Sequence, residues 1–195
     1  MAKIQKIKEN INQKEYIKLM NSIRGNQTIR KNTKNNLLRT FCILYYTGLR
    51  LNELQQLLIK DIKELIKNST VKIDIPKTKT QRKLFASNDF KKELNKIFDF
   101  SNEEDNNKVI SKGSNKDKKT SINNIVFISQ VNHHIKDILG IGFSSHSFRQ
   151  GLITQMGSRG INTKIISKYI GHKDIKTTMR YITPSDDDIQ NSIIR

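Results

Sequence analysis

The sequence predicts a mainly helical (α+β) domain that contains one small β-hairpin. The chain has 195 residues, which is the size of one ordinary domain with its own core. Most of its segments repeat apolar residues every three to four positions, as amphipathic helices do. Alternation of apolar and polar residues, which is typical of strands, occurs within residues 71–86. These patterns together predict several helices and one pair of strands.

Two helices are predicted near the N-terminus, followed by an arginine at the start of a third. Residues 1–11 are polar and basic and are expected to form a tail. An amphipathic helix is predicted from Asn12 to Gly25, and a core helix over residues 35–46. The helical period then restarts immediately after Arg50. The apolar residues that define these helices are Tyr16, Leu19 and Met20, then Leu38, Phe41, Cys42 and Tyr45, then Leu51, Leu54, Leu57 and Leu58.

A β-hairpin with a lysine-rich tip is predicted next. Residues 71–75 alternate apolar with charged side chains, and alternation resumes over residues 83–86. The polar segment KTKTQ at residues 77–81 lies between them and forms the expected tip. The hairpin therefore presents several lysines at one end.

The C-terminal half is predicted to be a loop followed by helices. Residues 101–124 contain few large apolar side chains, so we expect a long flexible surface loop without catalytic residues. Four helices are predicted over residues 129–139, 145–156, 162–170 and 174–182, with Ser145, Asn162 and Asp174 at N-cap positions. One domain is thus expected over residues 12–184. The tail at 185–195 starts with a helix signature and carries an apolar stripe, Ile189, Ile193 and Ile194, which we expect to dock on a neighbouring protomer.

The charge of the chain favours a nucleic-acid partner. It holds 36 Lys and Arg against 18 Asp and Glu, a net charge of +18. Such self-repulsion is relieved by a polyanion. A genome rich in A and T would also raise the lysine content, but it would not place arginines at particular positions.

The sequence also predicts a cytoplasmic location. Cys42 is the single cysteine, so no internal disulfide can form. No stretch approaches the roughly 18 consecutive apolar residues of a membrane-spanning helix, and the N-terminus lacks the apolar core of a signal peptide. We therefore expect a soluble protein that is not exported.

Five residues are candidates for a phosphate-activating site. His146 and Arg149 lie three positions apart at a helix start, so they share one face beside free backbone N–H groups. The guanidinium of Arg50 has the paired donors that suit a phosphate. His172 and Tyr181 follow in the same C-terminal region. Each residue alone has an ordinary alternative, such as an ion pair of Arg50 with Glu53 or a packing role for the tyrosine, but the ordered combination in a basic chain favours catalysis.

Three motifs resemble the tyrosine recombinases, the phage integrase family. They are TGLRLNEL at 47–54, HSFRQG at 146–151 and YIGHKDIKTTMRYITP at 169–184. The resemblance spans residues 12–184 and matches the multi-helix catalytic domain of that family. It implies that Arg50 and Arg149 bind the scissile phosphate, His146 assists proton transfer, His172 hydrogen-bonds the phosphate and Tyr181 is the nucleophile.

The same resemblance implies a general acid on the hairpin. Lys77 matches best because it opens the Lys-Thr pair after the first strand, and Lys79 is its rival. Glu53 matches the acidic residue that follows the first arginine, and Gln150 replaces a histidine often found after the second.

Phosphodiester chemistry explains why these residue types occur together. Fixed cationic donors stabilise charge on the nonbridging oxygens, and a phenol with an ordinary pKa of about 10 needs a base or a positive field. The leaving 5′-oxygen needs a proton, which a lysine supplies. We expect no metal and no other cofactor, because two arginines take the place of a cation. Neighbouring His133 and His134 should point apart and serve packing or surface roles.

The predicted function is site-specific recombination of double-stranded DNA through a 3′-phosphotyrosyl intermediate. A homo-oligomer, a tetramer on paired sites, is expected, with no membrane association. Most family members carry a further DNA-binding domain, so weak binding alone, an accessory DNA-binding protein or a longer parent chain is expected. The alternatives are a type IB topoisomerase or telomere resolvase, and a catalytically silent DNA-binding regulator. An RNA-binding module is disfavoured because exposed aromatic platforms are lacking.

Overall fold

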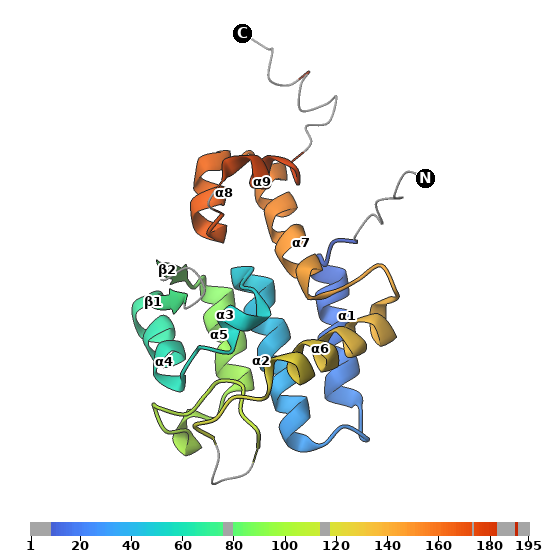
Figure 1. Cartoon of the computed structure of the whole chain (residues 1–195), viewed down its shortest axis with the longest axis vertical. Coiled ribbons are helices and arrows are strands. Elements are labelled where there is room, and N and C mark those ends of the chain that lie inside the picture. The colour runs from blue at the N-terminus through green and yellow to red at the C-terminus, as the bar shows by residue number, and fades with distance from the viewer. Residues whose placement is uncertain (1–8, 76–79, 114–117, 173, 183–189, 191–195) are drawn as a thin grey trace.

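The computed structural model describes residues 9–75, 80–113, 118–172, 174–182 and 190 (Figure 1). These residues form a helical body, a two-stranded hairpin and a smaller C-terminal lobe. The helices are α1 (Gln13–Gly25), α2 (Lys31–Thr47), α3 (Leu51–Leu54), α4 (Ile59–Asn68), α5 (Asn88–Ile97), α6 (Asn124–Leu139), α7 (Ser145–Ser158), α8 (Thr163–Ile170) and α9 (Ile175–Met179), with a 3-10 turn η1 (Phe100–Asn102). The strands are β1 (Thr70–Ile75) and β2 (Thr80–Phe85). The predicted mainly helical class with one hairpin is confirmed.

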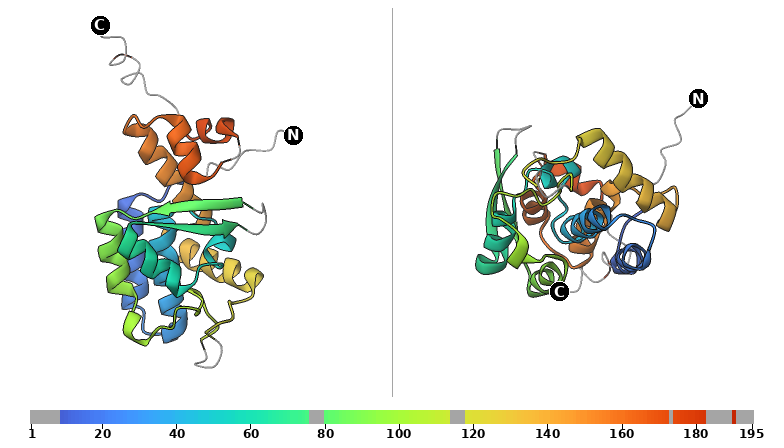
Figure 2. Two further views of the ribbon diagram at one scale, coloured as in Figure 1. Left: turned by 90° about the vertical axis from the view of Figure 1, so that its left-hand side faces the viewer. Right: turned by 90° about the horizontal axis from the view of Figure 1, so that it is seen from below.

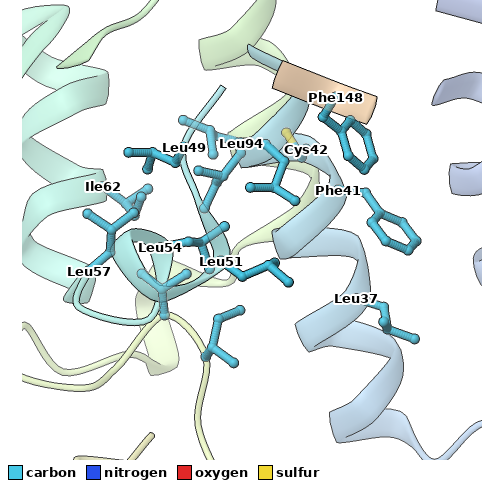
Figure 3. Packing of buried hydrophobic residues seen from close by; sticks show 14 of the residues in the cluster. Leu37, Phe41, Cys42, Leu49, Leu51, Leu54, Leu57, Ile62, Leu94 and Phe148 are labelled. Atoms are coloured by element: carbon cyan, nitrogen blue, oxygen red, sulfur yellow. The ribbon is translucent and has the colours of Figure 1, made fainter. Parts of the chain in front are cut away.

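Helix α2 is the centre of the main core. Helices α1, α3, α5 and α7 all pack against it. Figure 3 shows Phe41 of α2 facing Phe148 of α7, with their ring centroids 5.8 Å apart. Burial of each such side chain contributes about 1.5–3 kcal/mol. This packing fixes the start of α7, which carries His146 and Arg149, against the C-terminal half of α2.

Gly48 ends α2 in a conformation that a side chain would disturb. Its φ is +59°, and its N–H donates to Leu44 O at 2.9 Å. A Cβ placed there would lie 2.9 Å from Ile170 Cδ1 and 3.2 Å from Leu152 Cδ2. Glycine therefore lets the turn before Arg50 approach the helices of the C-terminal lobe closely.

The hairpin is antiparallel, with Val71 opposite Leu84 and Ile73 opposite Arg82. All four of these side chains are buried, so the inward face of β2 presents an arginine to the protein interior. The hairpin prediction is confirmed, but Lys77 and Lys79 of the expected tip lie outside the described residues. The apolar tail residues Ile189, Ile193 and Ile194 also lie outside them.

The prediction of an unpacked loop over residues 101–124 is wrong for its central part. Val109 and Ile110 are fully buried. Val109 N–H donates to Leu57 O at 3.1 Å, and Asn36 Nδ2 donates to Ser111 O at 2.9 Å. Two adjacent apolar residues and these hydrogen bonds attach the irregular segment to α2 and to the turn before α4, although its average composition is polar.

Several helix boundaries also differ from those predicted. Helix α2 begins at Lys31 and α6 at Asn124, earlier than expected, and α9 ends at Met179. The N-cap of α7 is Ser144, one residue before the predicted Ser145. Helices α4 and α5 were not predicted, although their apolar residues Ile59, Ile62 and Leu65, and Phe90 and Leu94, have helical spacing. No helix among the described residues has both the length and the apolar character needed to cross a membrane.

The C-terminal lobe lies over the hairpin. Figure 2 shows α8 and α9 beyond the end of α7, stacked above β1 and β2. Ile153, Ile166 and Ile170 form its small core, against which Tyr181 packs. The space between this lobe and the hairpin is where the candidate site lies.

Candidate active site

Glu53 is a buried carboxylate shared by two arginines. Arg50 is the N-cap of α3, and its Nη1 donates to Glu53 Oε1 at 2.7 Å. Arg82 Nη1 donates to Glu53 Oε2 at 3.1 Å. Burial alone would raise the pKa of the Glu53 carboxyl, but hydrogen bonds from Arg50 and the charge of Arg82 lower it below its ordinary value. Glu53 therefore stays ionised and holds both guanidinium groups.

Arg82 links three separate parts of the chain. Besides Glu53, it donates from Nη2 to Thr47 O at 2.7 Å and from Nε to Tyr169 O at 3.3 Å. A Cβ on Gly171 would lie 3.4 Å from Arg82 Cδ. Burial lowers the pKa of Arg82, and the charge of Glu53 opposes this effect. The hairpin is thereby tied to the end of α2 and to the end of α8.

Arg149 reaches the same region from α7. Its Nη1 donates to Gly48 O at 2.7 Å, whereas Nη2 is buried with no hydrogen-bond partner among the described residues. Burial and the charges of Arg50 and Arg82 lower the pKa of Arg149 to about 9. A buried donor without an acceptor is costly, so an anionic oxygen brought to this group would relieve both the missing bond and the repulsion.

His172 follows the left-handed Gly171 that ends α8. Its Nδ1 lies 2.8 Å from Thr178 Oγ1. Burial, followed by the charges of Arg149, Arg50 and Arg82, lowers the pKa of His172 to about 4. The imidazole is therefore neutral at physiological pH.

Tyr181 lies just after α9 and is half-buried against the lobe core. Its N–H donates to Thr178 O at 3.1 Å, and its carbonyl accepts from Thr154 Oγ1 at 3.3 Å. Its phenol lies within electrostatic range of Arg149. These backbone bonds thus hold Tyr181 within electrostatic range of the second arginine.

An open cleft of about 1160 Å³ separates the hairpin from α8. Its basic lining residues are Arg50, Arg82, Lys83, Lys168 and His172, its acidic ones are Glu53 and Asp174, and its apolar ones include Ile75, Phe85, Ile165 and Tyr169. Among the described residues the lining does not include His146, Arg149 or Tyr181. Cations outnumber anions along this surface, which suits a polyanionic ligand.

The structure thus gathers most of the predicted site but spreads its members over different depths. Arg50 and His172 line the cleft, and Arg149 is buried within electrostatic range of both. His146 lies on the first turn of α7 and is exposed. Lys77 and Lys79 are not among the residues that the structure describes.

Two residues of this site had no role in the sequence prediction. They are Arg82 and Thr178, neither of which is among the site residues that the sequence analysis names. The sequence signal for Arg82 is its place two positions before Leu84, because residues at this spacing lie on the same face of a strand. That face of β2 is buried, so the guanidinium points into the protein. Such a residue requires a buried partner.

The paired histidines of α6 do not behave as predicted. The rings of His133 and His134 make a T-shaped contact with 5.5 Å between their centroids, so the expectation that they point apart is wrong. In the described part of the chain, no group of three or more His, Cys, Asp or Glu residues is placed to hold a metal ion.

Comparison with known proteins relates the chain to one family. The model of the Phage integrase family matches residues 9–187. The chain is 29% identical over 165 residues to tyrosine recombinase XerA of Saccharolobus solfataricus, covering 85% of this chain and 51% of the relative. It is 29% identical over 166 residues to tyrosine recombinase XerC of Treponema denticola, covering 77% and 52%. The chain therefore spans about half the length of these curated relatives.

Solved structures share the fold. The Tn1549 transposon integrase in complex with circular intermediate DNA superposes with a TM-score of 0.75 at 16% identity, covering 100% of this chain and 67% of that one. For a crystal structure of XerA recombinase the TM-score is 0.70 at 19% identity, with 94% and 63% covered. The catalytic domain of bacteriophage HP1 integrase gives 0.56 at 15% identity, with 95% and 94% covered. These likenesses confirm the predicted catalytic-domain fold.

Proposed function

This chain belongs to the phage integrase family, and from that premise we propose that it is a site-specific recombinase that cuts and rejoins DNA strands. The observation that carries the proposal is the arginine cluster. Arg50, Arg82 and Arg149 interact electrostatically with one another and with the buried carboxylate of Glu53. Such an excess of fixed positive charge beside a tyrosine suits an anionic transition state.

In the proposed reaction Tyr181 attacks the scissile phosphorus. A bond forms between the phenolic oxygen and phosphorus while the bond from phosphorus to the 5′-oxygen breaks, which leaves a 3′-phosphotyrosyl link and a 5′-hydroxyl. Arg50 and Arg149 stabilise the nonbridging oxygens, and His172 donates a hydrogen bond to one of them. The phenolic proton passes to His146, in keeping with its place one turn before Arg149.

A lysine at the hairpin tip protonates the leaving 5′-oxygen in this scheme. Lys77 is our choice and Lys79 its rival. Attack of another strand's 5′-hydroxyl on the phosphotyrosyl link then reverses each step and restores Tyr181. Because one phosphodiester replaces another, the cycle needs no external energy source.

The proposed substrate is double-stranded DNA. The net charge of +18 and the basic lining of the cleft support this choice. The solved Tn1549 integrase and XerH recombinase were both bound to DNA. Complete exchange breaks two strands in each of two duplexes, and each copy supplies one Tyr181, so we propose a tetramer on paired sites. We also propose that an accessory DNA-binding protein or region assists, and that the protein acts in the cytoplasm.

The test is covalent capture of DNA. The protein is incubated with a pool of nicked duplexes of randomised sequence, in which the nick lets the short 5′-hydroxyl fragment diffuse away. A protein–DNA adduct that survives denaturant is expected, and Tyr181→Phe should abolish it. Tyr45→Phe is the matched control, because Tyr45 stacks on Tyr16 in the main body at 4.1 Å between centroids.

Other outcomes separate the competing functions. Binding of duplex without any adduct would favour a catalytically silent regulator. Relaxation of a supercoiled plasmid that lacks paired sites would favour a type IB topoisomerase. An undiminished adduct yield in Tyr181→Phe would contradict the choice of nucleophile.

A further inference from the structure

The hydroxyl of Thr178 is fully buried against the imidazole of His172. Thr178 lies in α9 and has no exposed surface. Its Oγ1 is 2.8 Å from His172 Nδ1. A buried hydroxyl proton needs an acceptor, since leaving it unpaired costs about 1–3 kcal/mol. The question is therefore where this proton goes.

Two other buried threonines show the usual solution. In α2, Thr40 Oγ1 donates to Asn36 O at 2.7 Å, and Thr47 Oγ1 donates to Ile43 O at 2.6 Å. Both bonds run to the carbonyl four residues earlier, which is the ordinary helical arrangement. In the described part of the chain, the hydrogen-bond partner of the Thr178 hydroxyl is instead His172 Nδ1. Among the described residues, the Thr178 hydroxyl proton is therefore satisfied if this ring nitrogen accepts it.

This bond decides which ring nitrogen of His172 carries the proton. A neutral imidazole has one N–H and one lone pair. His172 is neutral because burial and the charges of Arg149, Arg50 and Arg82 lower its pKa to about 4. If Nδ1 accepts from Thr178, then Nε2 must carry the hydrogen. His172 lines the cleft, so the nitrogen left for a ligand is a donor.

We propose that Thr178 is a positioning residue that fixes His172 as the Nε2–H tautomer, so that Nε2 donates to a nonbridging phosphate oxygen. The proposal rests on the proposed recombinase function. In the opposite tautomer the Nε2 lone pair would face the phosphate and repel it. A serine keeps the hydroxyl at this position, whereas a valine has a similar shape and lacks it.

The first test observes the tautomer without any reaction. Long-range proton–nitrogen spectra of the uniformly 15N-labelled full chain distinguish a protonated from an unprotonated ring nitrogen, and His172→Gln identifies the signals of His172. At pH 7.5 the wild type and Thr178→Ser should show Nε2 protonated and Nδ1 unprotonated. Thr178→Val should show a mixture of both tautomers. A wild-type ring protonated at Nδ1 would overturn the proposal.

The second test measures the first-turnover rate of adduct formation on nicked DNA. Removal of one fixed donor to a developing oxyanion lowers a rate by about 10²–10³-fold, so His172→Ala sets the upper limit. Because Thr178 acts through His172, Thr178→Val should lower the rate less, by about 10–100-fold. Thr178→Ser should form the adduct at nearly the wild-type rate. The double variant Thr178→Val/His172→Ala should be no slower than His172→Ala alone.

Thr40→Val is the matched control. It removes an equally buried hydroxyl in α2 and costs comparable stability, but it leaves His172 untouched. Equal rates for Thr40→Val and Thr178→Val in folded proteins, or a double variant much slower than His172→Ala, would refute the positioning role. If the wild type forms no adduct at all, the proposed function fails, while the spectra still decide the tautomer of His172.

Discussion

Glu53 and Arg82 form an ion pair at 3.1 Å with both side chains buried. Their partners make the pair a junction, since Glu53 also holds Arg50 and Arg82 also binds the carbonyls of Thr47 and Tyr169. Removal of one member of a buried pair leaves the other charge poorly compensated. The junction therefore couples the stability of the domain to the geometry of the candidate site.

Replacement of Arg82 should be strongly destabilising. Arg82→Met keeps the aliphatic stem but loses the ion pair and two carbonyl bonds, so we expect a loss of about 3–5 kcal/mol in the free energy of unfolding. Urea denaturation at pH 7 measures it. Lys72→Met is the control on the same hairpin, because Lys72 is exposed on β1 and its removal should change stability by less than about 0.5 kcal/mol. Similar losses in the free energy of unfolding for the two variants would show that the Glu53–Arg82 pair does not stabilise the domain.

His172 should make the protein less stable as the pH falls. In the folded chain its pKa is lowered to about 4 by burial and by Arg149, Arg50 and Arg82. In the unfolded chain a histidine has its ordinary pKa of about 6.5. Between these values the unfolded state binds more protons, so the free energy of unfolding decreases as the pH is lowered through this window.

His172→Gln provides the comparison, because glutamine does not titrate. Both proteins are denatured with urea at several pH values from about 7 to about 4.5, the range where the folded and unfolded states differ in protonation. The free energy of unfolding should decrease more steeply with falling pH for the wild type than for His172→Gln. Parallel curves would mean that the folded and unfolded chains bind the His172 proton equally well.

The sequence predicted the elements that have strong local signals. The periodic stripe around Tyr16 and Leu19 marked α1, and the restart after Arg50 placed this arginine at the N-cap of α3. The segment at 101–124 was misjudged because average composition conceals a short buried run, Val109 and Ile110. Local periodicity cannot show which distant groups meet.

The candidate site was likewise predicted where its residues belong to sequence motifs, but not where they meet only through tertiary packing. The motifs identified Arg50, Arg149, His172 and Tyr181, which tertiary structure brings into one electrostatic cluster. The contact between His172 and Thr178 spans a turn between two helices, so no helical or strand period predicts it. Roles that depend on such packing had to await the structure.

Binding to nonspecific duplex should weaken steeply with salt. Lys and Arg side chains displace counterions from the phosphates, so the logarithm of affinity falls linearly with the logarithm of salt concentration. Lys168→Ala removes one cation of the cleft and should reduce the slope by about one. Lys96→Ala is the control, because Lys96 pairs with Glu93 on α5 at 2.7 Å. Titration by fluorescence anisotropy at several salt concentrations gives both slopes. A flat dependence for the wild type would argue against a DNA-tracking surface.

The last prediction concerns the lysine that protonates the leaving 5′-oxygen. Lys77 and Lys79 lie outside the described residues, but the hairpin that holds them is tied to the site by Arg82. We predict that Lys77 is the acid, because it follows directly where β1 passes into the tip. Lys77→Ala should slow cleavage by about two to four orders of magnitude on ordinary DNA.

A substrate with sulfur in place of the bridging 5′-oxygen separates proton donation from every other role. The thiolate departs without a proton, so Lys77→Ala should cleave it at nearly the wild-type rate, whereas a variant that merely disturbs the hairpin stays slow on both substrates. Lys79→Ala should cleave ordinary DNA at nearly the wild-type rate, so the substrate with bridging sulfur should give it no relative gain in rate. The reverse pattern would assign the acid to Lys79. If neither variant shows rescue, the acid lies elsewhere. Lys83, which is exposed and lines the cleft, is then the next residue to test with the same pair of substrates. Arg82 is a weaker candidate because it is held in its buried ion pair with Glu53.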